Sequence, residues 1–333
     1  MECPSLALLP GPPAGKTGWP WNIETPPLPK TMANGRHWPA ISIVTPSFNQ
    51  GIYLEETLRS VLLQGYPNLE FYVMDGNSTD ESVQILRKYS PWLTGWVSEA
   101  DRGQSHAINK GWTRASGDLI AYLNSDDFYY PGALQKVAEA WNMDPSVAFI
   151  TGGVAYTGEW TAINEQKPFL RAEPPLDLSL LEPGAWFLPQ QSTFFARQHL
   201  DQVGRFLREE LHFTMDRELM YRMCRHGRVL LLPDILAGDR QHTHSKRLSQ
   251  TVRMYREDAT ALEYCTWGGR KEAAQRKRVA RWRLAQGHFL YADRSPSGLS
   301  KLVHLTAAAY NRPTYLRRRS FYKTLARAFG LRQ

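Results

Sequence analysis

The chain is poor in cysteine and in long apolar runs. Its 333 residues include only three cysteines, Cys3, Cys224 and Cys265. Because they are widely spaced and odd in number, they argue against a disulfide framework, show no zinc spacing and favour a reducing cytoplasm. No apolar run approaches the roughly 18 residues that a membrane-spanning helix needs. Residues 1–39 contain nine prolines and no cationic stretch followed by an apolar one, so we expect an extended N-terminal arm and no secretion signal.

Acidic residues are scarce at the C-terminal end. Residues 270–333 contain 16 Lys and Arg against two acids, Glu272 and Asp293, a net charge of +14. The whole chain carries +8, so residues 1–269 carry 8 − 14 = −6. We expect residues 251–333 to form a basic helical C-terminal extension.

The end of this extension, residues 315–331, mixes basic residues with aromatic and aliphatic ones. Such a helix can lie at an anionic membrane surface, where each basic residue contributes about 1 kcal/mol. The expectation is a cytoplasmic protein with peripheral contact at the inner face of the membrane. The alternative is a solvated helical hairpin that packs on the rest of the protein. Nucleic acid is not expected as a partner, because the tail has no recognisable binding motif and the rest of the chain is acidic.

Strand and helix patterns alternate through the first half of the chain. Residues 41–44, 69–74, 93–98, 119–123 and 147–152 are predicted strands. The predicted helices are residues 53–64, a helix that opens at residues 78–81 and runs to about residue 89, and residues 105–115 and 132–142. Ser78-Thr-Asp-Glu81 fits a capping box at the start of the second helix. This alternation predicts an α/β fold with a mainly parallel sheet and right-handed crossovers.

Polar clusters follow three of the predicted strands, at residues 45–51, 75–80 and 124–127. Ligands of such sheets bind outside the carboxyl ends of the strands, where all three clusters are expected. Asp126 and Asp127 are adjacent carboxylates at a strand end, and Mg²⁺ and Mn²⁺ prefer oxygen ligands while keeping places for phosphate oxygens. The alternative is that Ser-Asp-Asp merely ends the strand in a turn.

The first β-α turn lacks the glycine signatures of two other nucleotide-binding classes. A dinucleotide-dependent oxidoreductase would carry Gly-x-Gly-x-x-Gly there, but this turn is Thr45-Pro-Ser-Phe-Asn-Gln-Gly51. The Gly-rich loop with Arg or Lys that is expected of a sugar nucleotidyltransferase is also missing.

An ordered set of segments resembles the family 2 glycosyltransferases with a GT-A fold, of the bacterial polysaccharide type. The segments are Ile41-Ser-Ile-Val-Thr-Pro-Ser-Phe-Asn-Gln-Gly51, Asp75-Gly-Asn-Ser-Thr-Asp80, Asp101-Arg-Gly-Gln-Ser-His-Ala-Ile-Asn-Lys-Gly111, Asn124-Ser-Asp-Asp127, Pro189-Gln-Gln-Ser-Thr-Phe-Phe195, Met215-Asp216 and Arg240-Gln-His242. The resemblance spans about residues 41–246. It departs from the family at Asn124, where a DxD-type metal motif often has its first Asp.

The resemblance implies a Rossmann-like sheet flanked by helices, with a catalytic domain at residues 40–250. Its nucleotide-sugar half would be residues 40–155 and its acceptor half residues 156–250. The implied activity is a metal-dependent, inverting transfer of a sugar from a nucleoside-diphosphate sugar, with UDP favoured by family frequency, to a glycan or lipid-linked acceptor in polysaccharide biosynthesis. The cofactor would be Mn²⁺ or Mg²⁺. The alternative is a catalytically degenerate GT-A protein that binds a nucleotide sugar or glycan as a scaffold.

The resemblance also assigns donor-binding residues, which are Thr45, Pro46, Asn49, Asp75, Arg102, Asn109, Asn124 and Gln190. A carboxylate at Asp75 would accept the ring N–H of a uracil or thymine base, and its alternative is an Asx-turn beside Gly76. Arg102 would meet the diphosphate or a sugar hydroxyl through its planar fork. The alternative for Arg102 is a surface arginine paired with Asp101. The alternative for Asn109 is an amide on a helix surface.

The resemblance assigns Asp126, Asp127 and His242 to the metal and Asp216 to the role of general base. An ordinary polar role remains the alternative for His242, and His244 lies only two positions away. Asp216 begins a predicted helix, where the macrodipole also favours an acidic residue for purely structural reasons.

Overall fold

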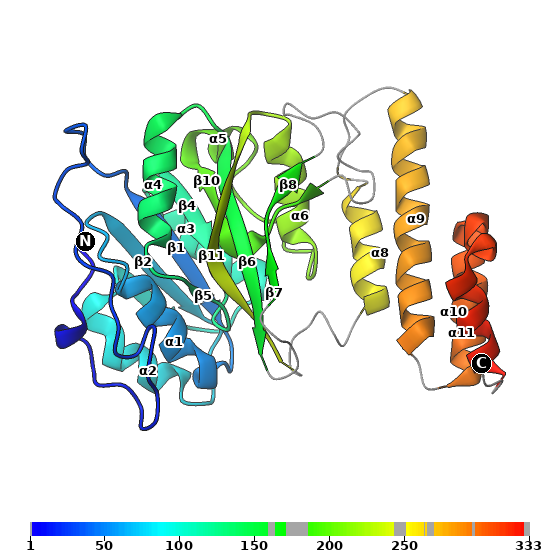
Figure 1. Ribbon diagram of the computed structural model, residues 1–333, viewed down its shortest axis with the longest axis horizontal. Helices are drawn as coiled ribbons and strands as arrows, with labels where there is room; N and C mark the ends of the chain where they lie inside the picture. The colour runs from blue at the N-terminus through cyan, green and yellow to red at the C-terminus, as the bar shows by residue number, and fades with distance from the viewer. Residues whose placement is uncertain are drawn as a thin grey trace. The chain divides into compact units, whose positions relative to one another are not determined.

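The computed structural model of the chain describes residues 2–158, 164–170, 186–242, 251–262, 264, 270–294 and 297–329 (Figure 1). The chain forms two compact units. We call them the sheet unit, Met1–Leu176, Trp186–Glu209 and Arg222–His242, and the helical unit, Asp177–Ala185, Glu210–Tyr221 and Thr243–Gln333.

A nine-stranded sheet, counted over the described residues, forms the centre of the sheet unit, in the order β3-β2-β1-β4-β10-β6-β11-β5 with β7 beside β6. The strands are β1 Ile41–Ser47, β2 Leu69–Asp75, β3 Gly95–Ser98, β4 Leu119–Tyr122, β5 Phe128–Tyr129, β6 Phe149–Gly158, β7 Asn164–Gln166, β10 Thr193–Ala196 and β11 Val229–Gln241. β8 (Phe169–Leu170) and β9 (Trp186–Phe187) form a separate pair. The strands β3, β2, β1 and β4 are all parallel. Beyond β4 the sheet is mixed, because β10 runs antiparallel to both β4 and β6.

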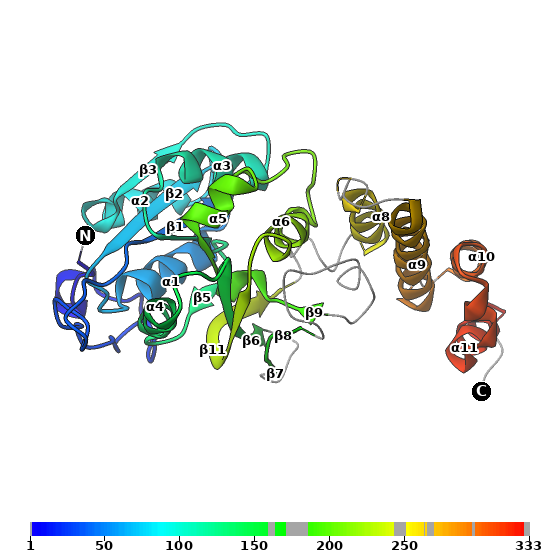
Figure 2. The ribbon, with the colours of Figure 1, turned by 90° about the horizontal axis from the view of Figure 1, so that it is seen from above.

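Helices cover both faces of the parallel half, so β1 is buried along its whole length. α1 (Gly51–Leu62) and α4 (Ala133–Met143) cover one face, and α3 (Gln104–Arg114) covers the other (Figure 2). α2 (Ser82–Tyr89) packs beside α1, and α5 (Arg197–Gln202) follows β10. α3 approaches β1 closely at Gly111, where a Cβ would lie 2.4 Å from Val44 Cγ1.

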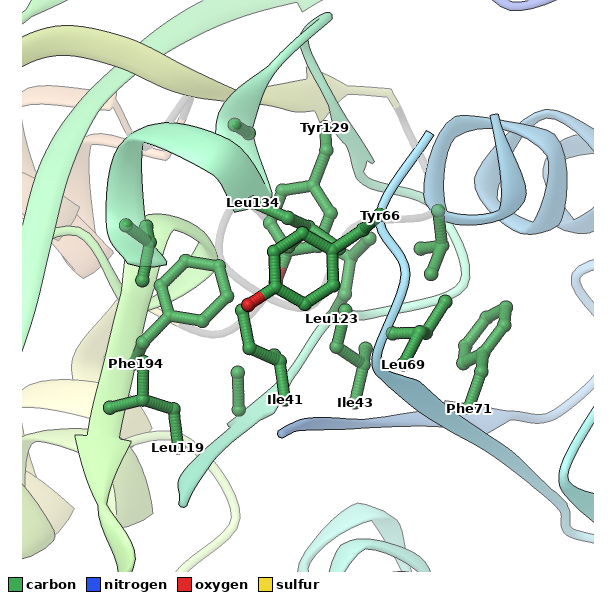
Figure 3. Close-up of a cluster of buried hydrophobic side chains, with 14 of the residues drawn as sticks. Ile41, Ile43, Tyr66, Leu69, Phe71, Leu119, Leu123, Tyr129, Leu134 and Phe194 are labelled. Carbon is green, nitrogen blue, oxygen red and sulfur yellow. The ribbon is translucent and has the colours of Figure 1, made fainter. Parts of the chain in front are cut away.

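The main apolar core lies between the sheet and the α1–α4 layer. Figure 3 shows side chains of neighbouring strands meeting there, among them Ile41, Ile43, Leu69, Phe71 and Phe194. Burial of apolar side chains of this size contributes about 1.5–3 kcal/mol each. The core therefore holds the strands whose carboxyl ends carry the polar loops.

Every strand and helix predicted between residues 41 and 152 is present, with bounds that differ by a few residues. The predicted capping box is wrong. α2 begins at Ser82, and the Ser78 hydroxyl donates to Asp75 Oδ1 instead. Asp80 takes over at this helix start, since its carboxylate accepts the amides of Ser82 and of Gly51 at the start of α1. Asp80 thereby joins the N-termini of two helices.

The proline-rich arm is part of the sheet unit and packs on its core and on α1. Leu9, Met32 and Trp38 are buried in the core. Arg59 of α1 is fully buried, and its guanidinium donates to the carbonyls of Pro10, Pro20 and Trp21. A proline-rich segment has few backbone N–H groups, so many of its carbonyls lack a donor within the segment. A guanidinium carries five N–H groups, and Arg59 therefore supplies donors to several of these carbonyls.

In the helical unit, the described residues from 251 on form α8 (Thr251–Ala261), α9 (Arg270–Arg294), α10 (Gly298–Asn311) and α11 (Arg319–Ala328), with a 3₁₀ turn at Pro313–Arg317. A small core of Ala285, Ala292, Leu305, Tyr315 and Phe321 joins α9, α10 and α11. α6 (Met215–Cys224) begins in this unit. Among the described helices, none has the length and apolarity to cross a membrane.

Candidate functional site

The polar loops that follow β1 and β2 lie together at one edge of the sheet. In the parallel register, Ser47 at the end of β1 is opposite Asp75 at the end of β2. The loops are bonded to each other, since Asn49 Oδ1 accepts the Thr79 amide at 2.8 Å and the Asn49 amide donates to Ser78 Oγ at 2.8 Å. Asn49 has a positive φ of 51°, which turns its backbone toward this partner.

Asp126 and His242 meet beside these loops. Asp126 Oδ2 lies 3.0 Å from His242 Nε2, although 116 positions separate the two residues. β11 pairs antiparallel with β5, which directly follows Asp127, and this pairing brings the end of β11 to the Asp126 loop. The Tyr53 ring of α1 packs on the imidazole with 4.7 Å between ring centroids. His242 is buried, whereas the Asp126 side chain is 24% exposed.

Asp127 is buried in an acidic environment. Its carboxylate accepts Asn124 Nδ2 at 3.1 Å and the Arg240 amide at 3.3 Å. Burial raises the pKa of Asp127 well above its ordinary value, and the negative charges of Asp126 and Asp239 raise it further. Asp239 of β11 accepts Gln191 Nε2 at 2.7 Å. Asp239, which lies in none of the predicted site motifs, is part of an acidic cluster with Asp126 and Asp127.

Arg240 ties this acidic cluster to α1. Its guanidinium lies 2.9 Å from Glu56 Oε1 and donates to the Asp126 carbonyl at 2.8 Å. It lies between the rings of Tyr53 and Phe128, at 5.0 and 5.4 Å from their centroids. Planar guanidinium groups suit such stacked and forked contacts.

The contribution of α1 was also missed. Tyr53, Glu56 and Thr57 all face the site, and the Thr57 hydroxyl lies within hydrogen-bond distance of the carbonyls of Ser125 and Asp127. Their spacing of three and four residues places them on one helix face. This spacing is visible in the sequence and could have indicated that the three side chains face one site.

The carboxylate of Asp126 and the imidazole of His242 fit a divalent cation. Their facing atoms, Asp126 Oδ2 and His242 Nε2, form a hydrogen bond of 3.0 Å. The same separation is expected of neighbouring ligands that each lie about 2.1 Å from an octahedral ion. Within the part of the chain that the structure describes, no three His, Cys, Asp or Glu side chains form a complete metal cluster. Two protein donors suit a cation that takes its other ligands from phosphate and water. The assignment of Asp127 as a further ligand stays a prediction.

Asp75 braces its own turn. It is fully buried, and its carboxylate accepts the Ser78 amide at 2.9 Å, Ser78 Oγ at 2.5 Å and Ser98 Oγ at 2.6 Å. Its predicted contact with a base stays a prediction. Thr45 and Pro46 are buried beside it in β1, and Thr45 Oγ1 has no hydrogen-bond partner among the described residues.

Arg102 and Asn109 both contact the segment at residues 207–209. Arg102 Nη2 lies 2.6 Å from Glu209 Oε2, so the alternative of a pairing with Asp101 is wrong. Asn109 is buried rather than a surface amide, because its Nδ2 donates to the Leu207 carbonyl and its Oδ1 accepts the Leu207 amide, both at 2.9 Å. Their roles in donor binding stay predictions.

Asn124 is fixed at both ends of its amide. Its Oδ1 accepts Gln104 Nε2 at 2.6 Å, and its Nδ2 donates to Asp127. An aspartate here would add a fourth negative charge beside the acidic cluster, whereas the amide supplies a donor. Gln190 is buried and donates from Nε2 to the Tyr122 carbonyl at 2.7 Å, which fixes the loop that precedes β10. Donor binding by Asn124 and Gln190 stays a prediction.

Asp216 lies in the first turn of α6, as predicted, and belongs to the helical unit. Its Oδ1 accepts the Arg217 amide at 2.8 Å, and its side chain is partly exposed. Its role as a base stays a prediction. His244, the alternative to His242, lies outside the described residues.

Solved structures with a similar fold bind nucleotide sugars. S. aureus TarS 1–349, solved in complex with UDP-GlcNAc, has a TM-score of 0.59 and 16% identity over 88% of this chain and 92% of that one. A mannosyltransferase from Pyrobaculum calidifontis, in complex with GDP-Man and Mn²⁺, has a TM-score of 0.53 and 18% identity over 93% and 89%. At these identities the likeness shows a shared fold, which is the GT-A type expected from the sequence.

Curated relatives are glycosyltransferases by name. An uncharacterized glycosyltransferase of Nostoc sp. is 27% identical over 63% of this chain and 67% of its own length. Another, from Mycobacterium tuberculosis, is 31% identical over 50% of this chain and 63% of its own. The putative teichuronic acid biosynthesis glycosyltransferase TuaG of Bacillus subtilis is 37% identical over 33% and 45%, so the match spans less than half of that protein. The family model "Glycosyl transferase family 2" matches residues 42–212, which include β1, the Asp75 turn and the Asp126–Asp127 loop. The chain belongs to glycosyl transferase family 2.

Proposed function

We propose that this protein transfers a sugar from a nucleoside-diphosphate sugar, preferably a UDP-sugar, to a hydroxyl of a glycan or lipid-linked acceptor, with inversion and with Mn²⁺ or Mg²⁺. The observation that carries the proposal is the contact of His242 with Asp126, a member of the acidic cluster. This pair lies next to the edge of the sheet where ligands bind in α/β folds. TarS with UDP-GlcNAc, the mannosyltransferase with GDP-Man and Mn²⁺, and the name of TuaG support the donor class, the metal and polysaccharide synthesis respectively.

In this proposal Asp126 and His242 hold the cation, with Asp127 as a further candidate ligand. The cation would neutralise the charge that grows on the departing nucleoside diphosphate. Arg240 keeps the Asp126 loop in place, and the buried Thr45, Pro46 and Asp75 shape the wall next to the donor. Asn49 and Asn124 fix the loops around it, while Arg102, Asn109 and Gln190 complete the proposed donor site.

Asp216 is the proposed general base. A sugar hydroxyl is a weak nucleophile at neutral pH, and a positioned carboxylate that takes its proton contributes roughly 100- to 10,000-fold. The proton passes from the acceptor hydroxyl to Asp216 as the new glycosidic bond forms and the sugar–phosphate bond breaks. A direct displacement of this kind inverts the anomeric carbon and needs no covalent enzyme intermediate.

The decisive experiment measures release of nucleoside diphosphate from a panel of nucleotide sugars with Mn²⁺, with and without EDTA, in the presence of candidate acceptors. We expect turnover that requires both the cation and Asp216. Asp216→Asn should reduce turnover by roughly 100-fold or more, whereas the matched control Asp201→Asn, which changes an exposed aspartate paired with Arg205, should not. Donor binding without turnover by the wild-type protein would instead support the scaffold alternative.

A second part of the proposal concerns an anionic membrane. The face of α11 opposite Phe321 carries exposed Arg319, Tyr322 and Lys323, whereas Arg327 pairs with Asp293 of α9. Phe321 itself is buried in the helical-unit core, so this basic and aromatic face is turned away from that core. Basic residues around an interfacial aromatic ring favour anionic lipid surfaces, where a lipid-linked acceptor would be found.

Vesicle co-sedimentation tests this contact. The double variant Arg319→Glu/Lys323→Glu should lose binding to vesicles with anionic lipid and keep turnover on a soluble acceptor. The control Lys30→Glu/Arg87→Glu makes the same change of charge at exposed positions of the sheet unit and should leave vesicle binding intact. An equal loss of vesicle binding in both variants would mean that net charge alone causes the binding. Unchanged vesicle binding in both variants would contradict the proposed membrane contact.

A further inference from the structure

The start of α6 is held by a glutamate of α8. Glu257 Oε1 accepts the amides of Phe213 at 2.6 Å and Thr214 at 2.9 Å, and it lies 3.2 Å from the Thr214 hydroxyl. These two amides immediately precede the first residue of α6, Met215. A carboxylate at a helix N-terminus is also favoured by the macrodipole. Glu257 therefore fixes the backbone at which α6 begins.

The neighbouring residue of α8 holds the same helix one turn on. Asp258 Oδ2 lies 2.7 Å from Arg217 Nη1 and 3.1 Å from Arg283 Nε of α9. Asp258 is 1% exposed, so removal of either partner would leave a buried charge poorly compensated. Burial lowers the pKa of Arg217, but the neighbouring acidic groups, Asp258 first among them, raise it above its ordinary value. Arg217 is thus held in its charged form.

Asp216 lies between these two attachments. Glu257 fixes the backbone of Phe213 and Thr214 on one side, and Asp258 fixes Arg217 on the other. We propose that Glu257 and Asp258 of α8 are positioning residues for the general base Asp216. The helical extension would then belong to the catalytic apparatus, besides any role at a membrane. This inference rests on the proposed function, because it assumes that Asp216 is the base.

The physical reason is the short reach of proton transfer. A base must come within about 2.6–3.2 Å of the hydroxyl that it deprotonates. A displacement of about 1 Å at a site of this kind can cost about 100-fold in rate. Loss of the Glu257 contacts frees the two amides before α6, so the first turn can shift and carry Asp216 with it. Donor binding, which we assign to residues of the sheet unit, would be spared.

Glu257→Ala and Glu257→Gln of the full-length protein test the role of Glu257. We expect Glu257→Ala to lower kcat about 10- to 100-fold and to leave KM for the donor within about twofold of wild type, since the ground-state donor contacts are unchanged. Glu257→Gln keeps an amide oxygen as acceptor and should recover most of the lost kcat. Glu139→Ala, on the exposed face of α4, is the matched control and should change neither constant.

Amide hydrogen exchange supplies a readout that does not need activity. Glu257→Ala should speed exchange at Phe213 and Thr214 relative to wild type, and Glu139→Ala should not. Protection that is equal in Glu257→Ala and wild type overturns the inference, and so does faster exchange with an unchanged kcat.

Arg217→Met breaks the Asp258 contact on the other side and tests the inference if Glu257→Ala misfolds. A lowered kcat at constant donor KM supports the positioning role, and an unchanged kcat refutes it. Absence of transfer by the folded wild-type enzyme would overturn the proposed function and the positioning role, while exchange would still report the Glu257 contacts.

Discussion

Two loops at the same edge of the sheet surround their aspartates in different ways. In the loop after β2, Asp75 accepts three hydrogen bonds, and Asp80 accepts the amides of Gly51 and Ser82. Burial raises the pKa of Asp80, but these hydrogen bonds outweigh it and hold the pKa below its ordinary value. In the loop after β4, burial and the charges of Asp126 and Asp239 raise the pKa of Asp127.

The number of hydrogen-bond donors around each carboxylate distinguishes those that stabilise the fold from those that favour binding of a cation. Donors around Asp75 and Asp80 offset the cost of their charge, so that loop is held by its own contacts. The acidic cluster brings the carboxylates of Asp126 and Asp239 close to the buried Asp127, which costs free energy in the isolated protein and is offset when a cation binds. Four measurements test whether the two loops differ in this way.

Asp126→Asn should have the largest effect. The amide keeps the shape of the side chain but weakens its hold on a cation, so turnover should fall about 100-fold or more. The free energy of unfolding should change little, because loss of one charge from the acidic cluster offsets the weakened contact with His242. Turnover assays and thermal unfolding of the same samples check both parts. A variant with full turnover would remove Asp126 from the cation site.

The second largest effect should come from addition of Mn²⁺, which should stabilise the wild-type protein. A cation at about 100-fold its dissociation constant adds about 2.7 kcal/mol to the free energy of unfolding when only the folded state binds it. The melting temperature should rise with Mn²⁺ and return with EDTA. Asp126→Asn is the control, and an equal rise in that variant would place the cation elsewhere.

Asp75→Ala should act mainly on stability. It leaves Ser78 and Ser98 without their buried acceptor, and hydrogen bonds to a charged group contribute about 1.5–3 kcal/mol. We expect a loss of about 2 kcal/mol in chemical denaturation, on that basis. Asp234→Ala, an exposed aspartate that pairs with Lys136, should change stability far less. Unchanged stability of Asp75→Ala would contradict the bracing role.

The smallest effect concerns acid stability at Asp80. Its pKa lies below the ordinary 3.8 in the folded protein, so its contribution is present above that value and is lost as pH falls through the folded pKa. The stability difference between wild type and Asp80→Asn should be full above about pH 4 and shrink below it. Urea unfolding between about pH 5 and pH 3 measures the difference. A difference that grows as the pH falls would reverse the assigned sign.

Local pattern was enough for most of the parallel half of the fold. The strands β1, β2 and β4 are apolar because helices cover both faces of the sheet there. The polar loops that follow them stand out in the sequence for this reason. The position of Asp126, Asp127 and Asp216 relative to these elements was therefore predictable. The capping box at Ser78 failed because Asp75 offered the Ser78 hydroxyl a stronger acceptor than the helix start did.

The sequence by itself determined which carboxylates stand at strand ends and helix starts, because strand and helix periods depend on neighbours a few positions apart. Only the tertiary structure decided which of them meet. His242 reaches Asp126 through the pairing of β11 with β5, and Asp239 joins the acidic cluster by the same route. Glu257 reaches the start of α6 across 43 positions of chain. Contacts of this range come from strand order and helix packing, which local periodicity does not encode.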